Sequence, residues 1–242
     1  MRTDSQYVFG TYELSTSLKE DDIEIIVEGQ GKRKQYFRRS GKDEIEKIIC
    51  AEGGNLVVCP VEPVSFPQEG VAEHLLIELN KPLIIESGVK DIIFVKFPIE
   101  IGVFLVDKRD VELIDIFTKI KPKYTLYGPP ESGIICRWWK SDIFDNKPSV
   151  KELYEGILKV DIANKYYEWV ELTKMVFGAY DMKIFYNDSA YIHARLTILN
   201  KTIGETTFST RRPTDMKESL DIYISRGVKK LEKKFIMEWR FK

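Results

Sequence analysis

The chain of 242 residues lacks the short motifs that identify most nucleotide-binding and hydrolytic enzymes. It has no GxGxxG or GxxxxGK[ST] phosphate loop and no GxSxG nucleophile turn. Its two histidines, His74 and His193, stand alone, without HxH or HExxH spacing. The three cysteines form no CxxC pair. Because neither residue type occurs at metal-ligand spacing, the sequence predicts no metal site and no cofactor.

A strong charge imbalance and long apolar runs are also missing. The formal net charge is −1, so the chain has no overall field to attract nucleic acid or an acidic membrane surface. The first five residues are polar and do not resemble a signal peptide. The most apolar stretch, residues 92–106, is interrupted by Lys96, Pro98 and Glu100, and falls short of the roughly 18 apolar residues of a spanning helix. These absences predict a cytoplasmic protein.

Cysteine is scarce and odd in number. Cys50, Cys59 and Cys136 each lie in an apolar, strand-like run, which predicts small buried side chains with free thiols in a reducing compartment. Lysine outnumbers arginine 26 to 11 and glutamine is rare. That bias is a hint of a thermophilic source, although an AT-rich genome produces it too.

Alternation of apolar and polar residues is the dominant pattern along the chain. It is clearest over residues 23–27, 158–162 and 192–198, where Ile, Val, Leu and Ala occupy every second position. About sixteen such segments recur at intervals of roughly 8–12 residues, separated by Gly, Pro, Asn and Asp. This spacing is typical of β-sandwiches and barrels. Residues 101–106 are apolar on both faces and need cover on both sides.

The polar, Pro-containing residues 145–149 are the best candidate for a domain boundary. The sequence therefore predicts a mainly β protein with two packed antiparallel β-sandwich-like domains, residues 1–146 and residues 147–242. A short internal echo supports the division, because residues 76–85 and 158–167 both read as strand, Asn-Lys turn, strand.

One C-terminal helix is predicted near residues 215–232. Asp215 and Glu218 have the spacing of a capping box, and an apolar stripe at helical spacing follows from Leu220 to Leu231. Leu220, Ile222 and Ile224 also alternate, so a strand competes with this helix. Residues 235–241 are predicted to close the chain as a strand.

Three carboxylates lie among apolar or proline neighbours: Glu62, Glu100 and Asp115. A carboxylate in such surroundings must pair with a cation, bind a metal or take up a proton. Both a structural buried pair and a functional acid fit this pattern. For Glu100 we expect Arg137 or Lys123 as the partner.

Aromatic residues cluster near Arg137. In a strand over residues 133–140, Arg137 and Trp139 share one face. With Tyr124 and Tyr127 they would form a platform on which a sugar or base stacks. Packing at a domain interface is the alternative explanation.

Four segments between about Val57 and Trp138 carry a family resemblance. They are residues 60–63 (PVEP), 97–102 (FPIEIG), 114–115 (ID) and 123–128 (KYTLYG). On these segments the chain resembles an archaeal family of proteins of unknown function, family four-thirty-two. The resemblance supplies no catalytic residues.

Three functions remain open. The first is a non-enzymatic β-sandwich protein that binds a protein partner or assembles with itself, which the doubly apolar strands and the missing motifs favour. The second is a carboxylate-dependent enzyme, for example a glycan hydrolase with Glu100 and Asp115 as acid and base, roughly 5–10 Å apart in an open cleft. The third is ligand or nucleic-acid binding through Arg137, Trp139 and nearby lysines.

Overall fold

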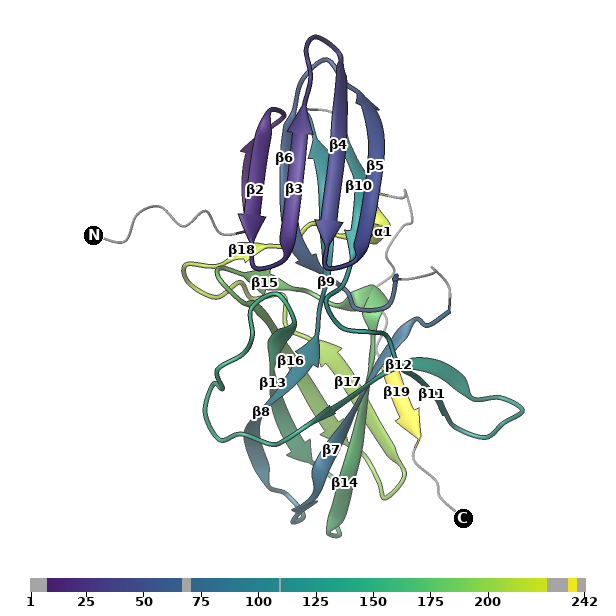
Figure 1. Cartoon of the computed structure of the whole chain (residues 1–242). Helices are drawn as coiled ribbons and strands as arrows, with labels where there is room; N and C mark the ends of the chain where they lie inside the picture. The colour runs from purple at the N-terminus through teal and green to yellow at the C-terminus, as the bar shows by residue number, and fades with distance from the viewer. Residues whose placement is uncertain (1–7, 67–70, 109, 226–234, 239–242) are drawn as a thin grey trace.

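The computed structural model describes residues 8–66, 71–108, 110–225 and 235–238. Strands dominate this part of the chain and form four sheets, which lie in two facing pairs one above the other (Figure 1). The prediction of a mainly β protein is therefore confirmed. Most neighbouring strands are antiparallel, but β7 and β12 pair in parallel, as do β13 and β16.

The first sheet pair consists of the β4 sheet and the β9 sheet. The β4 sheet has the order β2 (Thr16–Glu20), β3 (Ile23–Glu28), β4 (Arg33–Ser40), β5 (Asp43–Cys50). The β9 sheet has the order β1 (Gly10–Glu13), β6 (Asn55–Val61), β9 (Glu100–Val106), β10 (Val111–Phe117). The predicted alternation explains their packing, since Ile23, Ile25 and Val27 are buried between the sheets.

The second sheet pair consists of the β7 sheet and the β13 sheet. The β7 sheet has the order β11 (Tyr124–Tyr127), β12 (Ile134–Ser141), β7 (His74–Ile85), β14 (Val170–Gly178). The β13 sheet has the order β18 (Lys217–Glu218), β15 (Phe185–Tyr186), β16 (Ala190–Ile198), β13 (Glu155–Asn164), β8 (Lys90–Pro98). In addition, β17 (Ile203–Phe208) pairs with β16, and β19 (Phe235–Glu238) pairs with β17.

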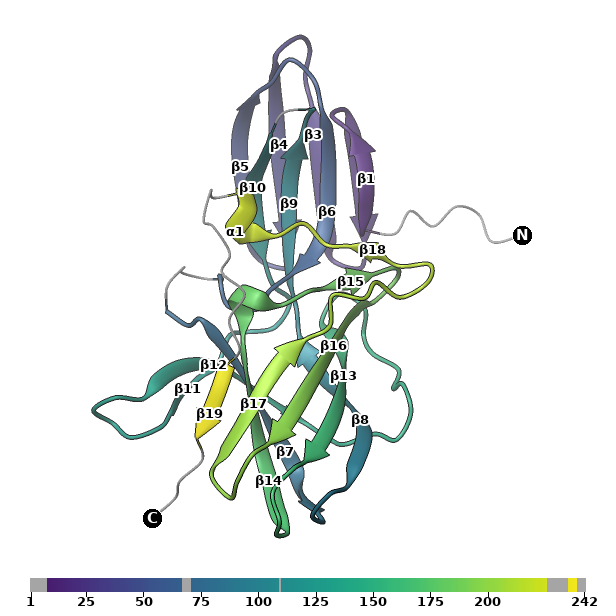
Figure 2. The ribbon, with the colours of Figure 1, turned by 180° about the vertical axis from the view of Figure 1, so that it is seen from behind.

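The chain crosses between the two pairs several times. It passes down after β6, returns at Ile99 between β8 and β9, and passes down again between β10 and β11. The buried side chains of all four sheets form one continuous hydrophobic cluster. Behind the β9 sheet lies α1 (Ile222–Ser225), with β15 and β18 below it (Figure 2). The 3₁₀ turn η1 (Ala179–Asp181) follows β14.

Strand pairing crosses the division predicted at residues 145–149. Strand β8 pairs with β13 over nine residue pairs, and β7 pairs with β14, so partners from both sides of that division share two sheets. Residues 145–149 connect β12 to β13 within the second sheet pair, and they are polar because most of them reach solvent. At Ile99 the chain passes from β8 in the second sheet pair to β9 in the first. Ile99 is fully buried, so this crossing lacks the polar residues that mark a linker.

The predicted C-terminal helix is corrected at its start. Asp215 has a φ of 64°, in the left-handed region, and Lys217 and Glu218 pair with β15 as strand β18. Within the described residues α1 is the only α-helix, and it covers Ile222–Ser225. Residues 226–232 of the prediction lie outside the described residues. The closing strand is confirmed over Phe235–Glu238 as β19, and residues 239–241 lie outside the described residues.

Candidate functional site

Glu100 is the first residue of β9, directly after the crossing at Ile99. It shares the outer face of the β9 sheet with Gly102 and Phe104, and its side chain is fully buried. The backbone N–H groups of Ser65 and Phe66 donate hydrogen bonds to its Oε2, at 3.0 and 2.9 Å. Glu100 therefore holds the segment that leaves β6 for the second sheet pair.

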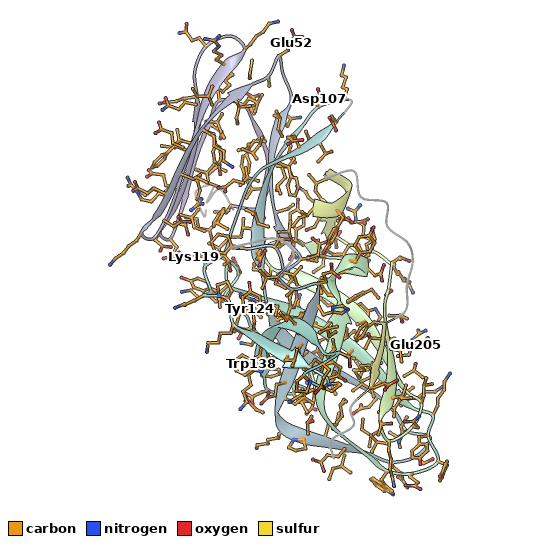
Figure 3. The ribbon with its side chains drawn as sticks, turned by 90° about the vertical axis from the view of Figure 1, so that its right-hand side faces the viewer. Glu52, Asp107, Lys119, Tyr124, Trp138 and Glu205 are labelled. Carbon is orange, nitrogen blue, oxygen red and sulfur yellow. The ribbon has the colours of Figure 1, made fainter. Side chains whose placement is uncertain are left out.

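Arg137 and Tyr124 complete this cluster from the second sheet pair. They face each other in the β11–β12 register, and the Arg137 guanidinium lies 5.8 Å from the centre of the Tyr124 ring. Tyr124 Oη donates to the Phe66 carbonyl at 3.0 Å, and Arg137 Nη2 donates to the Ile120 carbonyl at 3.4 Å. Glu100, the Phe66 backbone, Tyr124 and Arg137 thus form one group where the sheet pairs meet, which we call the junction cluster. In Figure 3, Tyr124 lies below Lys119 at this level.

Burial dominates the electrostatics of the junction cluster. It raises the pKa of Glu100 to about 8, against the opposing effects of the Ser65 N–H and the Arg137 charge. Burial also lowers the pKa of Arg137, and the nearby Glu100 carboxyl opposes that shift. Within the described residues, Glu100 Oε1 accepts no hydrogen bond, and Arg137 Nε and Nη1 donate none. Arg137 was one of two predicted partners of Glu100, and it acts on the carboxyl through space.

Glu62 lies close to the junction cluster but in a closed position. It is 3% exposed, and its charge helps to raise the pKa of Glu100. It lines a hollow of about 10 Å³ together with Met182, Ser219 and Asp221. A hollow of that size holds no more than about one water molecule. The structure therefore brings Glu62 and Glu100 together, and the hollow that Glu62 lines is too small to admit a substrate.

Asp115 lies elsewhere, between the two sheets of the first pair. Tyr36 Oη and Arg38 Nε, both on β4, donate to its Oδ2 at 2.9 Å each. The Asp115 and Arg38 side chains are 3% and 2% exposed, and Arg38 also contacts Asp43. Asp115 is therefore one half of a buried ion pair, and its partner, Arg38, is a residue for which the sequence analysis made no prediction.

The predicted aromatic platform is only partly assembled, because Tyr124, Arg137 and Trp139 share one face of the β7 sheet and Tyr127 does not. Tyr124 and Tyr127 are three residues apart in β11, so they project from opposite faces of the β7 sheet. Lys123 lies 5.4 Å over the ring of Trp138, on the side away from Tyr124. Trp139 is partly buried, and its Nε1 has no acceptor among the described residues. The Arg137 guanidinium lies over one face of the Tyr124 ring, which is partly buried.

The described residues hold no group of three His, Cys, Asp or Glu side chains placed to bind a metal ion. No helix within them is long and apolar enough to cross a membrane.

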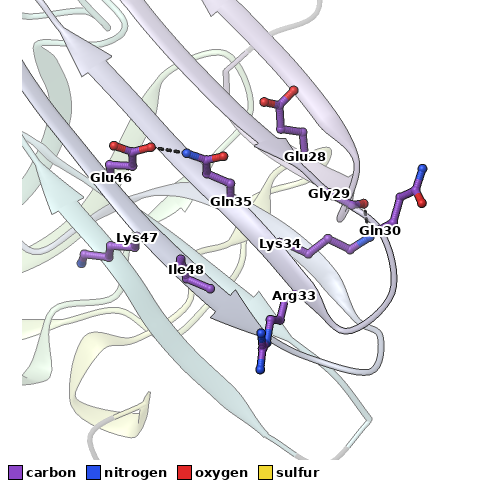
Figure 4. Close-up of a pocket in the computed structure, with 9 residues that line it drawn as sticks. All are labelled: Glu28, Gly29, Gln30, Arg33, Lys34, Gln35, Glu46, Lys47 and Ile48. Atoms are coloured by element: carbon purple, nitrogen blue, oxygen red, sulfur yellow. Dashed lines mark hydrogen bonds between the residues drawn. The ribbon is translucent and has the colours of Figure 1, made fainter.

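The most exposed of the large apolar side chains in the described residues lies on β5 and was not among the residues predicted from the sequence. Ile48 is 78% exposed. It stands between a hollow of about 800 Å³ on the outer face of the β4 sheet (Figure 4) and one of about 370 Å³ between β5 and β10. We call the residues of these two hollows the β5 surface. The sequence signal was present, since Ile48 and Ile49 are adjacent apolar residues and cannot both face inward.

The fold and these sites define a mainly β protein in which Glu62, Glu100 and Asp115 are buried. The family model for DUF432, described as a protein of unknown function, matches residues 8–238, and the chain belongs to this family. A search of curated proteins and a search of solved structures each found no match.

Proposed function

We propose that this protein is a non-enzymatic protein-binding module, built from two packed β-sandwich-like domains, that binds through the β5 surface. The observation that carries the proposal is the position of Ile48. It is 78% exposed, between two hollows and on a strand at the edge of its sheet. Exposed apolar residues that are grouped beside hollows, with a polar rim, are typical of protein-interaction sites.

The polar residues around Ile48 fit such a rim. Gln35 and Glu46 are joined by a side-chain hydrogen bond, and Lys34 donates to the Gly29 carbonyl (Figure 4). The first bond holds Gln35 and Glu46 in place on the outer face of the β4 sheet, and the second fastens the turn that precedes β4. A partner that covers Ile48 would therefore meet a surface that is already ordered, which lowers the entropy lost on binding.

The placement of the carboxylates argues against the enzyme alternative. Glu100 and Glu62 are closed in at the junction, and Asp115 is neutralised by Arg38. A glycosidase needs two carboxyls on one open cleft, with a separation that admits the sugar and water.

A hollow on the β13 sheet gives no support for nucleic-acid binding. This hollow is lined by three basic and three acidic side chains. They are Lys90, Lys165 and Arg195, and Asp91, Asp161 and Glu205. Balanced charge of this kind gives no preference for a phosphate backbone.

We place the protein in the cytoplasm as part of the same proposal. The three cysteines are free, and two of them, Cys59 and Cys136, are buried. Free thiols are typical of a reducing compartment.

The experiment compares two exposed isoleucines. The purified chain is immobilised and exposed to an extract of its source organism, and the captured proteins, including its own copies, are identified and then tested again in purified form. We expect Ile48→Asp to abolish specific capture. The matched control is Ile84→Asp, since Ile84 is 64% exposed at the far end of β7. Capture of nothing by the native chain, or equal capture by both variants, would overturn the proposal.

A further inference from the structure

Strand β5 has an open edge. It pairs with β4 over its full eight residues, and its other side has no partner strand in the described chain. Alternate N–H and C=O groups of an edge strand point away from the sheet and can pair with another strand.

The other sheet edges of the described residues are short or obstructed. Strands β1, β2 and β11 have at most five residues. Strands β10 and β14 contain irregularities in register, which bend an edge out of line. The edge of β8 is bridged by Phe144, whose backbone exchanges two hydrogen bonds with Phe94. Among these edges, β5 is the longest one that is regular and uncovered.

We propose that the β5 strands of two copies of this chain pair antiparallel across a two-fold axis, so that the two β4 sheets become one eight-stranded sheet. This inference rests on the proposed function and names its partner as a second copy. A two-fold axis brings the same strand from each copy together, which makes the contact closed and self-limiting. Backbone hydrogen bonds provide the pairing, and the side chains of β5 fix its register.

Charge selects the register. An axis at Lys47 or at Glu46 would place two like charges directly opposite each other, which is unfavourable. An axis at Ile48 places Ile48 opposite the second copy's Ile48, Lys47 opposite its Ile49, and Glu46 opposite its Cys50. This arrangement covers the most exposed apolar side chain of the described chain and opposes no like charges from residue 46 to residue 50.

The surroundings of β5 fit this contact. The hollow between β5 and β10 is lined by the partly buried Leu105, Leu113 and Ile114, so apolar surface flanks the edge on its inner side. On this inner side Lys47 Nζ donates a hydrogen bond to the Ile114 carbonyl, so the ammonium group already has a partner within its own chain. Glu46 and Cys50 lie on the outer face with Ile48, where a second copy's side chains would stand beside them.

The register can be tested by a cross-link. In Glu46→Cys, the new thiol would lie opposite the second copy's Cys50, which is exposed, and mild oxidation should link nearly all chains into dimers on a non-reducing gel. A bridge within one chain is excluded, because four residues along a strand span about 13 Å and a disulfide joins Cα atoms less than about 7 Å apart. Glu44→Cys is the matched control and should remain unlinked, as should Glu46→Cys combined with Cys50→Ser.

Sedimentation velocity on the unmodified chain gives the second readout. We expect a concentration-dependent dimer that Ile48→Asp converts to monomer and Ile84→Asp leaves intact. A native chain that stays monomeric, with Glu46→Cys unlinked, overturns the second-copy inference. If Ile48-dependent capture of a different protein persists in that case, the proposed function stands; if it is absent too, both fail. Linking by Glu44→Cys in place of Glu46→Cys overturns the register with Ile48 on the axis.

Discussion

Glu100 and Asp115 lie on adjacent strands of the β9 sheet, but their carboxylates point to opposite faces of it. Asp115 is opposite Val103 in the register, three residues along β9 from Glu100, and successive side chains of a strand alternate between faces. Asp115 therefore faces β4, where Arg38 neutralises it, and Glu100 faces the segment that enters the second sheet pair. The β9 sheet thus has one buried acid on each face: Asp115 binds the β4 sheet, and Glu100 binds the segment that follows β6.

The Asp115–Arg38 pair is expected to contribute strongly to stability. Asp115→Asn leaves a buried guanidinium with only Asp43 as counter-ion, and removing one member of a buried pair costs about 3–5 kcal/mol of unfolding free energy. The matched control is Asp43→Asn, because the Asp43 side chain is 56% exposed and an exposed pair is worth about 0–1 kcal/mol. Urea denaturation of both variants measures the difference. Equal losses would show that Asp115 is not the main partner of Arg38.

Glu100 should make stability fall as the pH rises. Its pKa is raised by burial from an ordinary 4.5 to about 8, so between these values the folded chain holds a proton that the unfolded chain releases. The unfolding free energy should therefore decrease across this window, by at most roughly 1.4 kcal/mol per pH unit, and level off above about pH 8.

Glu100→Gln isolates this effect, because it keeps the shape of the side chain and removes its ionisation. Its unfolding free energy minus that of the native chain should increase from about pH 5 to about pH 8 in urea titrations. A difference that shrinks with pH would mean that ionised Glu100 is stabilised by Arg137, and a constant difference would mean that Glu100 does not titrate in this range.

Strands were predictable where one face of a sheet is buried and the other is not. Residues 23–27, 158–162 and 192–198 alternate for that reason and lie in β3, β13 and β16. The repeated passage of the chain between the two sheet pairs could not be predicted from composition. At Ile99 the chain crosses through the core, where a polar linker would be unfavourable, so the crossing reads as continuous strand.

The candidate site was predictable only in part. The apolar neighbours of Glu62, Glu100 and Asp115 correctly indicated burial, because each is at most 5% exposed. The partner of Asp115 was harder to find, since Arg38 is 77 residues away and stands in a run of basic residues. Its one signal is alternation with Tyr36, which places both side chains on the inward face of β4. Long-range pairing of this kind depends on sheet packing.

The three thiols should differ sharply in reactivity. Cys50 is exposed at the end of β5, which corrects the prediction that all three are buried. Cys59 and Cys136 are buried, and burial raises the pKa of each to about 12, so little thiolate forms at neutral pH. A colorimetric thiol reagent should therefore titrate one group quickly in the folded protein and three after denaturation without reductant. A denatured count of one would reveal a disulfide and contradict the cytoplasmic assignment.

Gly102 should be intolerant of a side chain, because it lies between Glu100 and Phe104 on the outer face of β9. A Cβ at this position would come within 2.6 Å of the Phe104 ring and 2.8 Å of Val61, closer than packed atoms allow. Gly102→Ala is expected to cost about 1–3 kcal/mol of unfolding free energy, the range for inserting an extra carbon into a close-packed core. Gly53→Ala is the matched control and should be nearly neutral, since a Cβ there meets nothing within 4 Å.

A double-mutant cycle tests whether the Phe104 ring is the obstacle. Phe104→Leu alone should destabilise the fold by removing buried ring atoms. Combined with Gly102→Ala, it frees the space that the new Cβ needs, so the double variant should lose less unfolding free energy than the sum of the two single variants. A coupling of about 0.5 kcal/mol or more is expected for residues in contact. Additive losses in urea denaturation would show that Val61 or the backbone, and not the Phe104 ring, requires glycine at this position.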